Sequence, residues 1–339
     1  MNVLIIGGTG LISTATTRRL LEKGATITHY NRGKRSAEFD GRVATITGDR
    51  YDHVSFEAQM ASLPYFDVVI DMIGYAPEDG RSLIRAFSGK TSHLVFCSTV
   101  DVYDRFALQK NPCYPIPEGV PLGGRNDYGR NKVICENILQ EASAGGAFPL
   151  TILRPAHTYN DGGAIIHSFG WGTFWIDRLR KNRPIIVHGD GMSLWTICHA
   201  DDVGPAFAEA AGNPVAMGKS YNVAGAEWLT WDEMYLLAAQ TLGTSTPRLK
   251  HIPSEILVRI APKVSGIFPE NFMHNNIFDN SAAQRDLNFG YTVPFTEGVR
   301  RVVNNLDSRN AVQNSDDQPW YDTLLADWER IISNIPPLA

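Results

Sequence analysis

The 339-residue sequence has no run of about twenty apolar residues, the length that a membrane-spanning helix needs. Its N-terminal apolar run is short and carries no basic leader, so we expect no signal peptide. Acidic residues outnumber lysine and arginine by 36 to 31, and the net charge is -5. The strongly basic face of a non-specific nucleic-acid binder is therefore not expected. These absences predict a cytoplasmic protein without a membrane segment and disfavour nucleic acid as a partner.

Cysteine is also scarce, with four residues and no CxxC spacing, at Cys97, Cys113, Cys135 and Cys198. In a chain of this length the pattern predicts neither a disulfide framework nor a metal site. Hydrophobic residues make up 43% and charged residues 20%, which is ordinary globular composition and enough for a sizeable core.

Short apolar runs alternate with helical stretches along the first half of the chain. The expected strands are residues 3–6, 25–30, 43–46, 68–73, 93–96 and 150–153, and the first helix is expected at 14–23. This alternation predicts an α/β fold, a doubly wound parallel Rossmann sheet with helices on both faces. Ligands of such sheets bind at the carboxyl ends of the strands.

The second half of the chain is less regular. We expect helices at 174–181, 201–211, 231–242, 296–306 and 320–332, strands at 185–187, 194–199 and 221–223, and an exposed loop at 308–318. Thr230 and Glu233 have the spacing of a capping box. The expected division is a Rossmann core of residues 1–165 rejoined by about 194–225, with a smaller α/β substrate-binding lobe from about 166–193 and 226–339.

A glycine-rich turn with the spacing GxxGxxS follows the first strand, from Gly7 to Ser13. Gly7 permits a sharp turn and Gly10 lets the backbone approach a pyrophosphate, while the next helix offers free N–H groups. The third position usually holds glycine, and Ser13 is small enough to replace it. The alternative is an ordinary strand-to-helix turn.

The segment after the second strand bears on the choice of nicotinamide cofactor. An NAD site usually has an acidic residue there, whereas this chain has the uncharged Asn31 followed by Arg32, Lys34 and Arg35. This favours NADP over NAD. The alternative is that the bases are solvated loop charges and Asn31 contacts an NAD ribose. Asp49, beside Arg50 at the third strand end, is placed to touch adenine or serves as a turn residue.

Tyr128 and Lys132 lie four residues apart at the start of an expected helix, and therefore on one helix face. A free tyrosine has a pKa near 10, which a nearby ammonium and a positive nicotinamide ring would lower. The phenolate could then remove a proton from a substrate hydroxyl as hydride leaves. Alone, the pattern also fits a surface helix. It gains weight from the hydroxyls of Ser98 and Thr99 after the fifth strand.

The chain resembles the extended short-chain dehydrogenase/reductase family, in its nucleotide-sugar epimerase and dehydratase branch. The matching motifs are GGTGLIS, GDRYD, DVVIDMIG, FCSTVDVY, YGRNK, LRPAHTY, GDG…HADDV, YNVAG and RDLNFGYTVPFTEGV, in the family's order. The YGR-K form and the NRG after the second strand are most similar to the atypical group near the chloroplast stem-loop-binding proteins.

The resemblance implies roles for individual residues. Tyr128 would be the acid/base, Lys132 the partner that lowers its pKa, and Thr99 the orienting hydroxyl, with Ser98 as the second choice. The implied cofactor contacts are Gly7, Thr9, Gly10, Leu11 and Ile12 on the pyrophosphate, Asn31, Arg32, Asp49 and Arg50 on the adenosine side, Met72, Ile73 and Gly74 on the ribose, and Ser98, Tyr128, Lys132, Pro155 and His157 near the nicotinamide. The implied substrate contacts are Thr99, Asp101, Tyr128, His157 and Trp195. His157 would face the substrate entrance, and the alternative is a structural histidine.

Two departures from the family pattern limit the chemistry. Sugar dehydratases carry Asp-Glu after the catalytic threonine, where this chain has Val100-Asp101, so acid-assisted dehydration is disfavoured. Asp101 is then a second proton-transfer group or a capping residue. The arginine expected soon after Gly191 is missing, and Trp195 offers an aromatic wall or packs in the core.

A basic run in the expected helix at 174–181 and just beyond it bears on the substrate. This run, Arg178, Arg180, Lys181 and Arg183, either binds phosphate or forms a solvated face. A substrate without a diphosphate is therefore an open alternative to a nucleotide sugar.

The sequence as a whole predicts an NAD(P)-dependent oxidoreductase or epimerase that acts on a sugar, nucleotide sugar or sugar-like alcohol. An RNA-binding protein or a cofactor-sensing regulator on the same fold are the alternatives. The acidic balance argues against RNA binding, and the intact Tyr128–Lys132 pair argues against both alternatives. No metal is expected, and a homodimer is a reasonable expectation.

Overall fold

The computed structural model describes residues 1–34, 39 and 41–335, which form two compact units. The first unit comprises Met1–Thr158, Ile197–Ala226 and Phe278–Thr292, and the second comprises Tyr159–Thr196, Glu227–Ile277 and Val293–Ala339. Residues 159–165, which the sequence predicts in the Rossmann core, belong to the second unit. Residues 278–292, which it predicts in the smaller lobe, belong to the first unit because Ala283, Leu287 and Phe289 are buried in that unit's core.

A seven-stranded parallel sheet forms the centre of the first unit, in the order β11-β6-β5-β4-β1-β2-β3. The strands are β1 (Asn2–Ile6), β2 (Thr26–Asn31), β3 (Val43–Thr47), β4 (Val68–Asp71), β5 (Leu94–Cys97), β6 (Leu150–Pro155) and β11 (Ser220–Val223). The chain moves outward from β1 on one side and from β4 on the other, which confirms the doubly wound α/β sheet. Ligands of such sheets bind where the strand order reverses.

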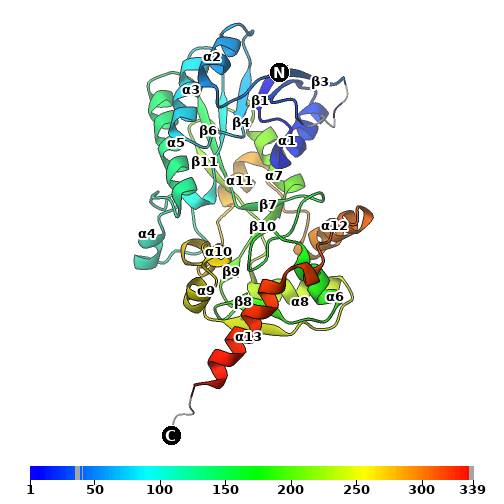
Figure 1. Cartoon of the computed structure of the whole chain (residues 1–339). Helices are drawn as coiled ribbons and strands as arrows, with labels where there is room; N and C mark the ends of the chain where they lie inside the picture. Colours follow the sequence, from blue (N-terminus) through cyan, green and yellow to red (C-terminus); the bar gives the residue numbers. More distant parts are fainter. Residues whose placement is uncertain (35–38, 40, 336–339) are drawn as a thin grey trace. The chain divides into compact units, whose positions relative to one another are not determined.

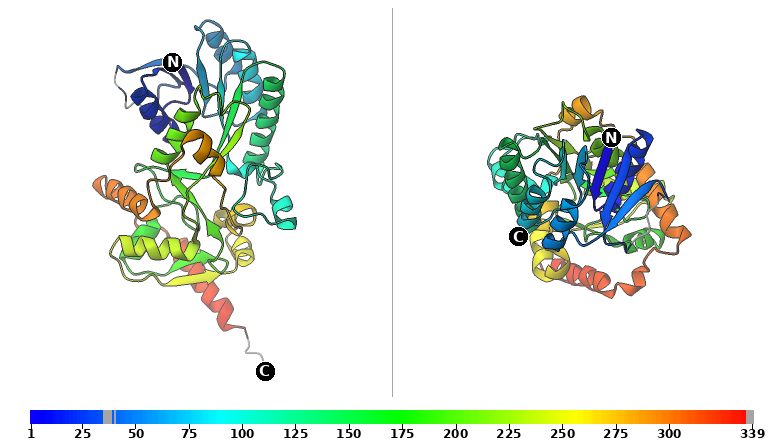
Figure 2. Two further views of the ribbon diagram at one scale, coloured as in Figure 1. Left: turned by 180° about the vertical axis from the view of Figure 1, so that it is seen from behind. Right: turned by 90° about the horizontal axis from the view of Figure 1, so that it is seen from above.

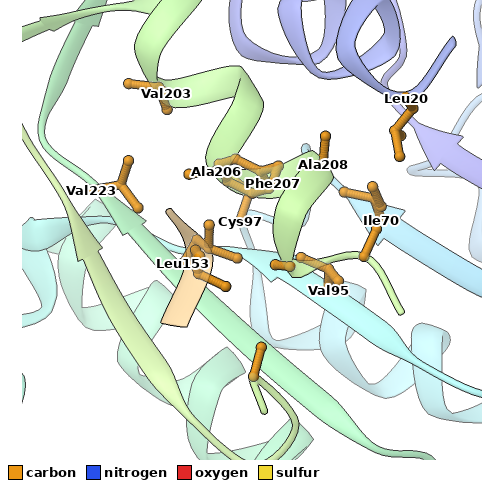
Figure 3. Packing of buried hydrophobic residues seen from close by; sticks show 14 of the residues in the cluster. Leu20, Ile70, Val95, Cys97, Leu153, Val203, Ala206, Phe207, Ala208 and Val223 are labelled. Atoms are coloured by element: carbon orange, nitrogen blue, oxygen red, sulfur yellow. The ribbon is translucent and has the colours of Figure 1, made fainter. Parts of the chain in front are cut away.

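Helices cover both faces of this sheet (Figures 1 and 2). One face carries α1 (Leu11–Glu22), α7 (Ala200–Ala210) and α11 (Ser281–Leu287), and the other carries α2 (His53–Ala61), α3 (Pro77–Phe87) and α5 (Asp127–Ala144). Successive strand residues alternate between these faces: Val3 and Ile5 point to the first and Leu4 and Ile6 to the second. Figure 3 shows Phe207 of α7 among the strand side chains of the first face.

The expected strand at 194–199 is wrong in one respect, because it is two short strands. Leu194–Trp195 is β9 of the second unit, where it pairs antiparallel with β12 (Leu229–Thr230). Ile197–His199 is β10 of the first unit, which pairs with β7 (His157–Tyr159). The chain passes from one unit to the other at Thr196.

The second unit is built on a parallel strand pair, β8 (Ile185–His188) and β13 (Leu249–Ile252). Its helices are α6 (Phe174–Arg180), α8 (Trp231–Thr241), α9 (Ser254–Ile260), α10 (Pro262–Ser265), α12 (Phe295–Ser308) and α13 (Pro319–Ser333). The capping box of α8 is confirmed, since Thr230 Oγ1 accepts from Glu233 N at 3.1 Å and Thr230 N donates to Glu233 Oε2 at 2.8 Å.

Three short turns and one helix complete the described elements. They are the 3₁₀ turns Val100–Val102 and Ser315–Asp317, the π-turn Phe268–Phe272 and α4 (Arg105–Lys110). Within the part of the chain that the structure describes, no helix has both the length and the apolarity needed to cross a membrane.

Candidate cofactor and active site

Two adjacent glycines shape the turn between β1 and α1. Gly7 has a φ of +86°, and a Cβ added there would lie 2.7 Å from Ile73 Cγ2. A Cβ on Gly8 would lie 2.3 Å from Cγ of the buried His29. Neither position has room for a side chain, so the backbone itself faces the carboxyl end of the sheet.

Ser13 performs a task that a glycine at this position could not. Its Oγ accepts a hydrogen bond from Gly10 N at 2.8 Å and donates one to Gly7 O at 2.7 Å. The side chain is 1% exposed. Ser13 therefore ties the glycine turn to the first turn of α1. The helix start retains N–H groups that can donate hydrogen bonds to an anion.

A cavity of about 320 Å³ lies beside this turn. Its lining residues are Gly7, Thr9, Gly10, Tyr30, Asn31, Arg32, Lys34, Gly48, Asp49, Arg50, Tyr51, Ile73 and Tyr75. Asn31 Oδ1 accepts from Gly33 N at 2.8 Å, which shapes the turn that carries the bases. Arg35, the third base of the NADP prediction, lies outside the described residues. The structure thus brings two predicted cofactor segments to one cavity. They are the glycine-rich turn from Gly7 to Ser13, called the phosphate turn below, and the segment that begins at Asn31.

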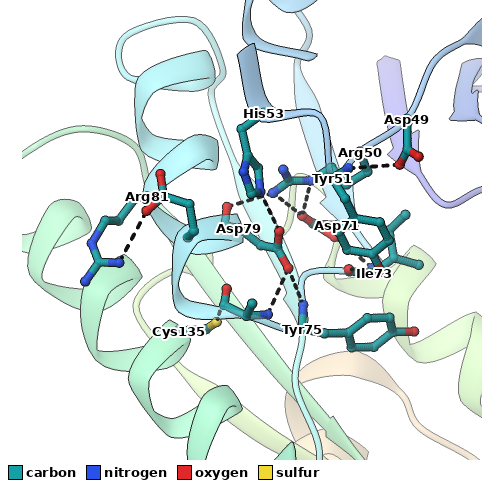
Figure 4. A network of polar contacts seen from close by, with 12 residues as sticks. Asp49, Arg50, Tyr51, His53, Asp71, Ile73, Tyr75, Asp79, Arg81 and Cys135 are labelled. Atoms are coloured by element: carbon teal, nitrogen blue, oxygen red, sulfur yellow. Dashed lines mark hydrogen bonds and ion pairs between the residues drawn. The ribbon is translucent and has the colours of Figure 1, made fainter. Parts of the chain in front are cut away.

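Arg50 is a structural residue as well as a lining residue of this cavity (Figure 4). Its guanidinium is 1% exposed, lies 3.3 Å from Asp71 Oδ2, and donates to the Asp79 carbonyl oxygen at 2.7 Å. Arg50 thus ties the end of β4 to the start of α3.

The carboxylate of Asp79 holds the segment between β4 and α3. It accepts from the backbone N–H groups of Tyr75 and Ala76 at 2.8 Å each, and its Oδ1 lies 2.8 Å from His53 Nε2. Burial alone would raise the pKa of Asp79, but these hydrogen bonds keep it below its usual value. The carboxylate therefore stays charged and fixes the segment that leads into the active site.

The sequence analysis missed two aromatic residues of this cavity, Tyr51 and Tyr75. Tyr51 is 45% exposed, and its hydroxyl donates to the Ile73 carbonyl oxygen at 3.3 Å. Tyr75 also lines the neighbouring cavity. Both follow strand-end motifs, GDR and MIG, so their positions carried the signal. Patterns of glycine and charge alone do not indicate these two tyrosines.

The neighbouring cavity, of about 310 Å³, contains the expected catalytic residues. Its lining residues are Gly7, Gly10, Leu11, Ile12, Ser13, Met72, Ile73, Tyr75, Cys97, Ser98, Thr99, Tyr128, Lys132, Pro155, Ala156 and Thr158. Thr99, Tyr128 and Lys132 therefore share a cavity with the phosphate turn. Gly74 and His157, which were expected to contact the cofactor, are not among these residues.

Lys132 is held tightly under this cavity. Its Nζ donates to the carbonyl oxygens of Gly74 and Cys97 at 2.6 Å each, and the residue is 1% exposed. The ammonium also lies 4.7 Å from the ring centre of Phe96 and 4.9 Å from that of Tyr75. Burial lowers its pKa, while the surrounding groups favour the charge. Gly74 thus has a defined role, as an acceptor for Lys132.

Tyr128 lies in the first turn of α5, which Asn126 caps by accepting from Gly129 N at 2.7 Å. The expected lowering of its pKa is wrong for the protein alone. Although the residue is 40% exposed, partial removal of its phenol from water raises the pKa, nearby Cys97, Tyr75 and Asp101 raise it further, and a hydrogen bond with Thr99 lowers it. The Lys132 ammonium points to backbone carbonyls and lies 5.9 Å from the Tyr128 ring centre. Tyr128 is therefore a neutral phenol at neutral pH.

The neighbouring hydroxyls of Ser98 and Thr99 are not equivalent. Ser98 Oγ donates to Glu136 Oε1 at 2.5 Å inside the protein. Thr99 Oγ1 accepts from Asp101 N at 3.2 Å and shares a hydrogen bond with Tyr128. Of the two predicted orienting hydroxyls, Thr99 therefore has the better position, and Asp101 contacts it through its backbone N–H.

With this geometry established, known proteins can be compared. The model of the NAD-dependent epimerase/dehydratase family matches residues 3–224, which is more than half of the chain. The chain belongs to this family. The resemblance seen in the sequence is thereby confirmed.

Two curated relatives of this epimerase/dehydratase family member show how broad the likeness is. The chain is 26% identical over 262 residues to the chloroplast stem-loop binding protein of 41 kDa b from Arabidopsis thaliana. The match covers 74% of this chain and 65% of the relative. It is 24% identical over 243 residues to 2′-dehydrokanamycin reductase from Streptomyces kanamyceticus, covering 72% and 67%. The chain therefore spans just under two thirds of the stem-loop binding protein.

A solved structure shows the same fold. The UDP-glucose 4-epimerase from Bifidobacterium longum in complex with NAD⁺ and UDP is 18% identical, with a TM-score of 0.70 over 92% of this chain and 100% of that chain. At this identity the likeness establishes the Rossmann-type architecture of the family member.

Three of the five predicted substrate contacts, Asp101, His157 and Trp195, line neither cavity. His157 is half-buried, and burial lowers its pKa to about 4, so the imidazole is neutral at neutral pH. Trp195 belongs to the second unit, is 5% exposed, and packs 5.4 Å from Trp231 and 5.0 Å from Phe272, centre to centre. The core-packing alternative for Trp195 therefore fits this family member better than an open aromatic wall.

The basic run of the second unit is committed to ion pairs within that unit. Arg178 pairs with Asp322 at 2.7 Å, Arg180 with Asp307 at 2.7 Å, Lys181 with Asp316 at 2.8 Å, and Arg183 with Asp316 at 2.5 Å. A phosphate bound here would have to displace carboxylates. Among the described residues of this family member, no group of three or more His, Cys, Asp or Glu side chains could hold a metal.

Proposed function

We propose that the chain is an NAD(P)-dependent oxidoreductase or epimerase that acts on a hydroxyl-bearing carbon of a sugar or sugar-like alcohol. The observation that supports it is the meeting of Thr99, Tyr128 and Lys132 at one cavity that also contains the phosphate turn. Family membership supports the same class of enzyme.

The residues present fit a nicotinamide dinucleotide. The side-chain-free turn at Gly7 and Gly8 and the start of α1 would hold the pyrophosphate. Residues of the cavity beside Asn31 and Asp49 would hold the adenosine, and Met72 and Pro155 the nicotinamide end. When bound, the nicotinamide supplies or accepts a hydride.

We propose NADP as the preferred form. Arg32 and Lys34 line the adenosine cavity, and Asn31 occupies the position where an acid would repel a 2′-phosphate. Asp49 also lines the cavity, but its Oδ1 accepts from Tyr51 N at 3.0 Å, which turns one carboxylate oxygen to the backbone.

In the proposed reaction Thr99 hydrogen-bonds the reacting substrate oxygen. Tyr128 donates a proton to that oxygen in reduction and removes it in oxidation. Tyr128 carries its proton at neutral pH and can donate it to a ketone oxygen, although its raised pKa makes it a weaker acid than a free tyrosine. Two N–H groups of Lys132 are bonded to carbonyls, which leaves the third for the cofactor side of the cavity.

The substrate we favour is a carbohydrate-like ketone or alcohol that lacks a diphosphate. Val100 supplies no acid for elimination of water. The cations that a diphosphate would need in the second unit are paired with aspartates. The likeness to a dehydrokanamycin reductase supports a substrate of this kind, and the likeness to a UDP-glucose epimerase supports a sugar.

The test is the variant Tyr128→Phe, assayed by NADPH consumption with a panel of keto sugars and with UDP-sugars. We expect turnover to fall about 10²–10⁴-fold, the usual contribution of a general acid or base. The dissociation constant of NADPH should stay within about twofold, since the fold and the phosphate turn are unchanged.

Tyr65→Phe is the matched control, because Tyr65 is an exposed tyrosine of the same unit that lines neither cavity. Its turnover should equal that of the natural chain. Full activity in Tyr128→Phe would refute the proposed mechanism.

A further inference from the structure

A chain of buried polar groups lies behind the active-site cavity. Ser98 Oγ donates to Glu136 Oε1 at 2.5 Å, while Arg154 Nε donates to the same oxygen at 3.0 Å and Arg154 Nη2 to Oε2 at 2.6 Å. Glu136 is fully buried, and Ser98 and Arg154 are each 3% exposed. Both carboxylate oxygens are thus occupied by protein donors.

The position of this carboxylate links two parts of the active site. Glu136 is four residues after Lys132 and therefore lies on the same face of α5. Ser98 lies between Cys97, whose carbonyl accepts from Lys132, and Thr99. Backbone N–H of Ser98 also donates to the Leu153 carbonyl at 2.7 Å.

Arg154 is in turn fixed from its far side. Its Nη1 donates to Tyr103 Oη at 3.1 Å and to the Glu118 carbonyl oxygen at 3.3 Å. Tyr103 Oη donates to Asn222 Oδ1 at 2.5 Å. The guanidinium is therefore held by Tyr103 and by the Glu118 carbonyl, and it gives Glu136 a defined position rather than a mobile one.

We propose that Glu136 is a positioning residue for the reaction. Held by Arg154, its carboxylate acts through the Ser98 hydroxyl to fix the segment Cys97–Thr99. This segment carries both the carbonyl that orients Lys132 and the hydroxyl of Thr99. The inference rests on the proposed function for its consequence in turnover.

Glu136 does not act as a catalytic residue in this scheme, because it lines neither of the two cavities. A buried ion pair is a weak source of stability, since desolvation offsets its Coulomb energy. Glu136 is assigned the positioning role because it accepts a hydrogen bond from Ser98, which lies between Cys97 and Thr99.

The test is Ser98→Ala, which removes the link to the active-site segment and leaves the Glu136–Arg154 pair intact. We expect kcat to fall at least about tenfold, because small misplacements of catalytic groups cost orders of magnitude. KM and the dissociation constant of NADPH should stay within about twofold. Ser98→Thr, which restores a hydroxyl, should recover much of kcat.

Tyr221→Phe is the control, because Tyr221 is a buried residue of the same sheet whose hydroxyl donates to Asp286 Oδ2 at 3.0 Å, outside this network. Its kcat should stay within about twofold of the natural chain even if its melting temperature falls as far as that of Ser98→Ala. Equal losses of kcat in the two variants would mean a merely structural role and would overturn the inference.

A second measurement does not depend on turnover. The rate at which acetic anhydride acetylates Lys132, followed by mass spectrometry, should rise several-fold in Ser98→Ala and stay unchanged in Tyr221→Phe, since a displaced Cys97 carbonyl releases the ammonium. An unchanged rate in Ser98→Ala would refute the positioning role. If turnover survived Tyr128→Phe, the proposed function would be refuted, and the acetylation measurement would remain valid.

Discussion

The two units use their charged groups in different ways. In the first unit, Lys132 is buried and bonded to two backbone carbonyls beside a cavity that also contains Tyr128 and the phosphate turn. In the second unit, the cations of α6 and of the residues just after it pair with aspartates more than a hundred residues later in the chain. In the first unit a buried helix charge therefore lies at the candidate ligand site beside the strand ends, whereas the charges of the second unit join segments of that unit.

To test this contrast, we expect the largest change in the free energy of unfolding from Arg178→Ala in the second unit. Arg178 is fully buried, stacks on the Tyr321 ring at 4.2 Å and donates to the Pro184 carbonyl at 2.9 Å. Its removal leaves a cavity, so the free energy of unfolding should fall by about 3–5 kcal/mol. Urea unfolding measures the loss. A loss below about 1 kcal/mol would contradict the structural role.

A change in the first unit should damage both stability and binding. Gly8→Ala places a Cβ against the His29 ring, so we expect a loss of about 1–3 kcal/mol and a clearly weaker affinity for NADPH. Calorimetric titration with NADPH measures the second effect. Gly119→Ala is the control, since nothing lies within 4 Å of an added Cβ there. Equal affinities in both variants would remove the phosphate turn from the proposed site.

What the sequence predicts well in this chain is local. Gly7, Thr99 and Tyr128 each follow or face a strand end, and the parallel arrangement brings strand ends to one edge of the sheet. Their meeting at one cavity therefore follows from strand order alone. The same reasoning could have included Tyr51 and Tyr75, which follow strand-end motifs of the same kind.

What the sequence could not predict depends on contacts between distant segments. The Ser98–Glu136 bond joins residues 38 positions apart, and only the fold makes the two hydroxyls of Ser98 and Thr99 different. The pKa of Tyr128 is raised by partial desolvation of its phenol and by Cys97 and Tyr75, which the five-residue spacing does not contain. The place of Trp195 was likewise decided by ring neighbours from two other segments.

A smaller effect should come from the adenosine side of the first unit. Arg32→Ala removes an exposed base from the cavity without disturbing the core. We expect the dissociation constant of NADPH to rise about tenfold, equivalent to about 1.4 kcal/mol, while that of NADH stays within about twofold. Comparative titrations check the difference. A parallel loss for both cofactors would refute the proposed NADP preference, and the NAD alternative would then explain Asn31.

The smallest effect should come from the exposed pairs of the basic run. Arg180 and Asp307 are 37% and 43% exposed, and such pairs contribute about 0.2–1 kcal/mol. Arg180→Ala should therefore change the free energy of unfolding by no more than this, and turnover by less than about twofold. Asp307→Ala tests the assignment from the other side, because it frees the arginine without removing it. If Asp307→Ala tightened binding of a UDP-sugar and Arg180→Ala weakened it, the run would be a phosphate site, and the contrast between the two units would not hold.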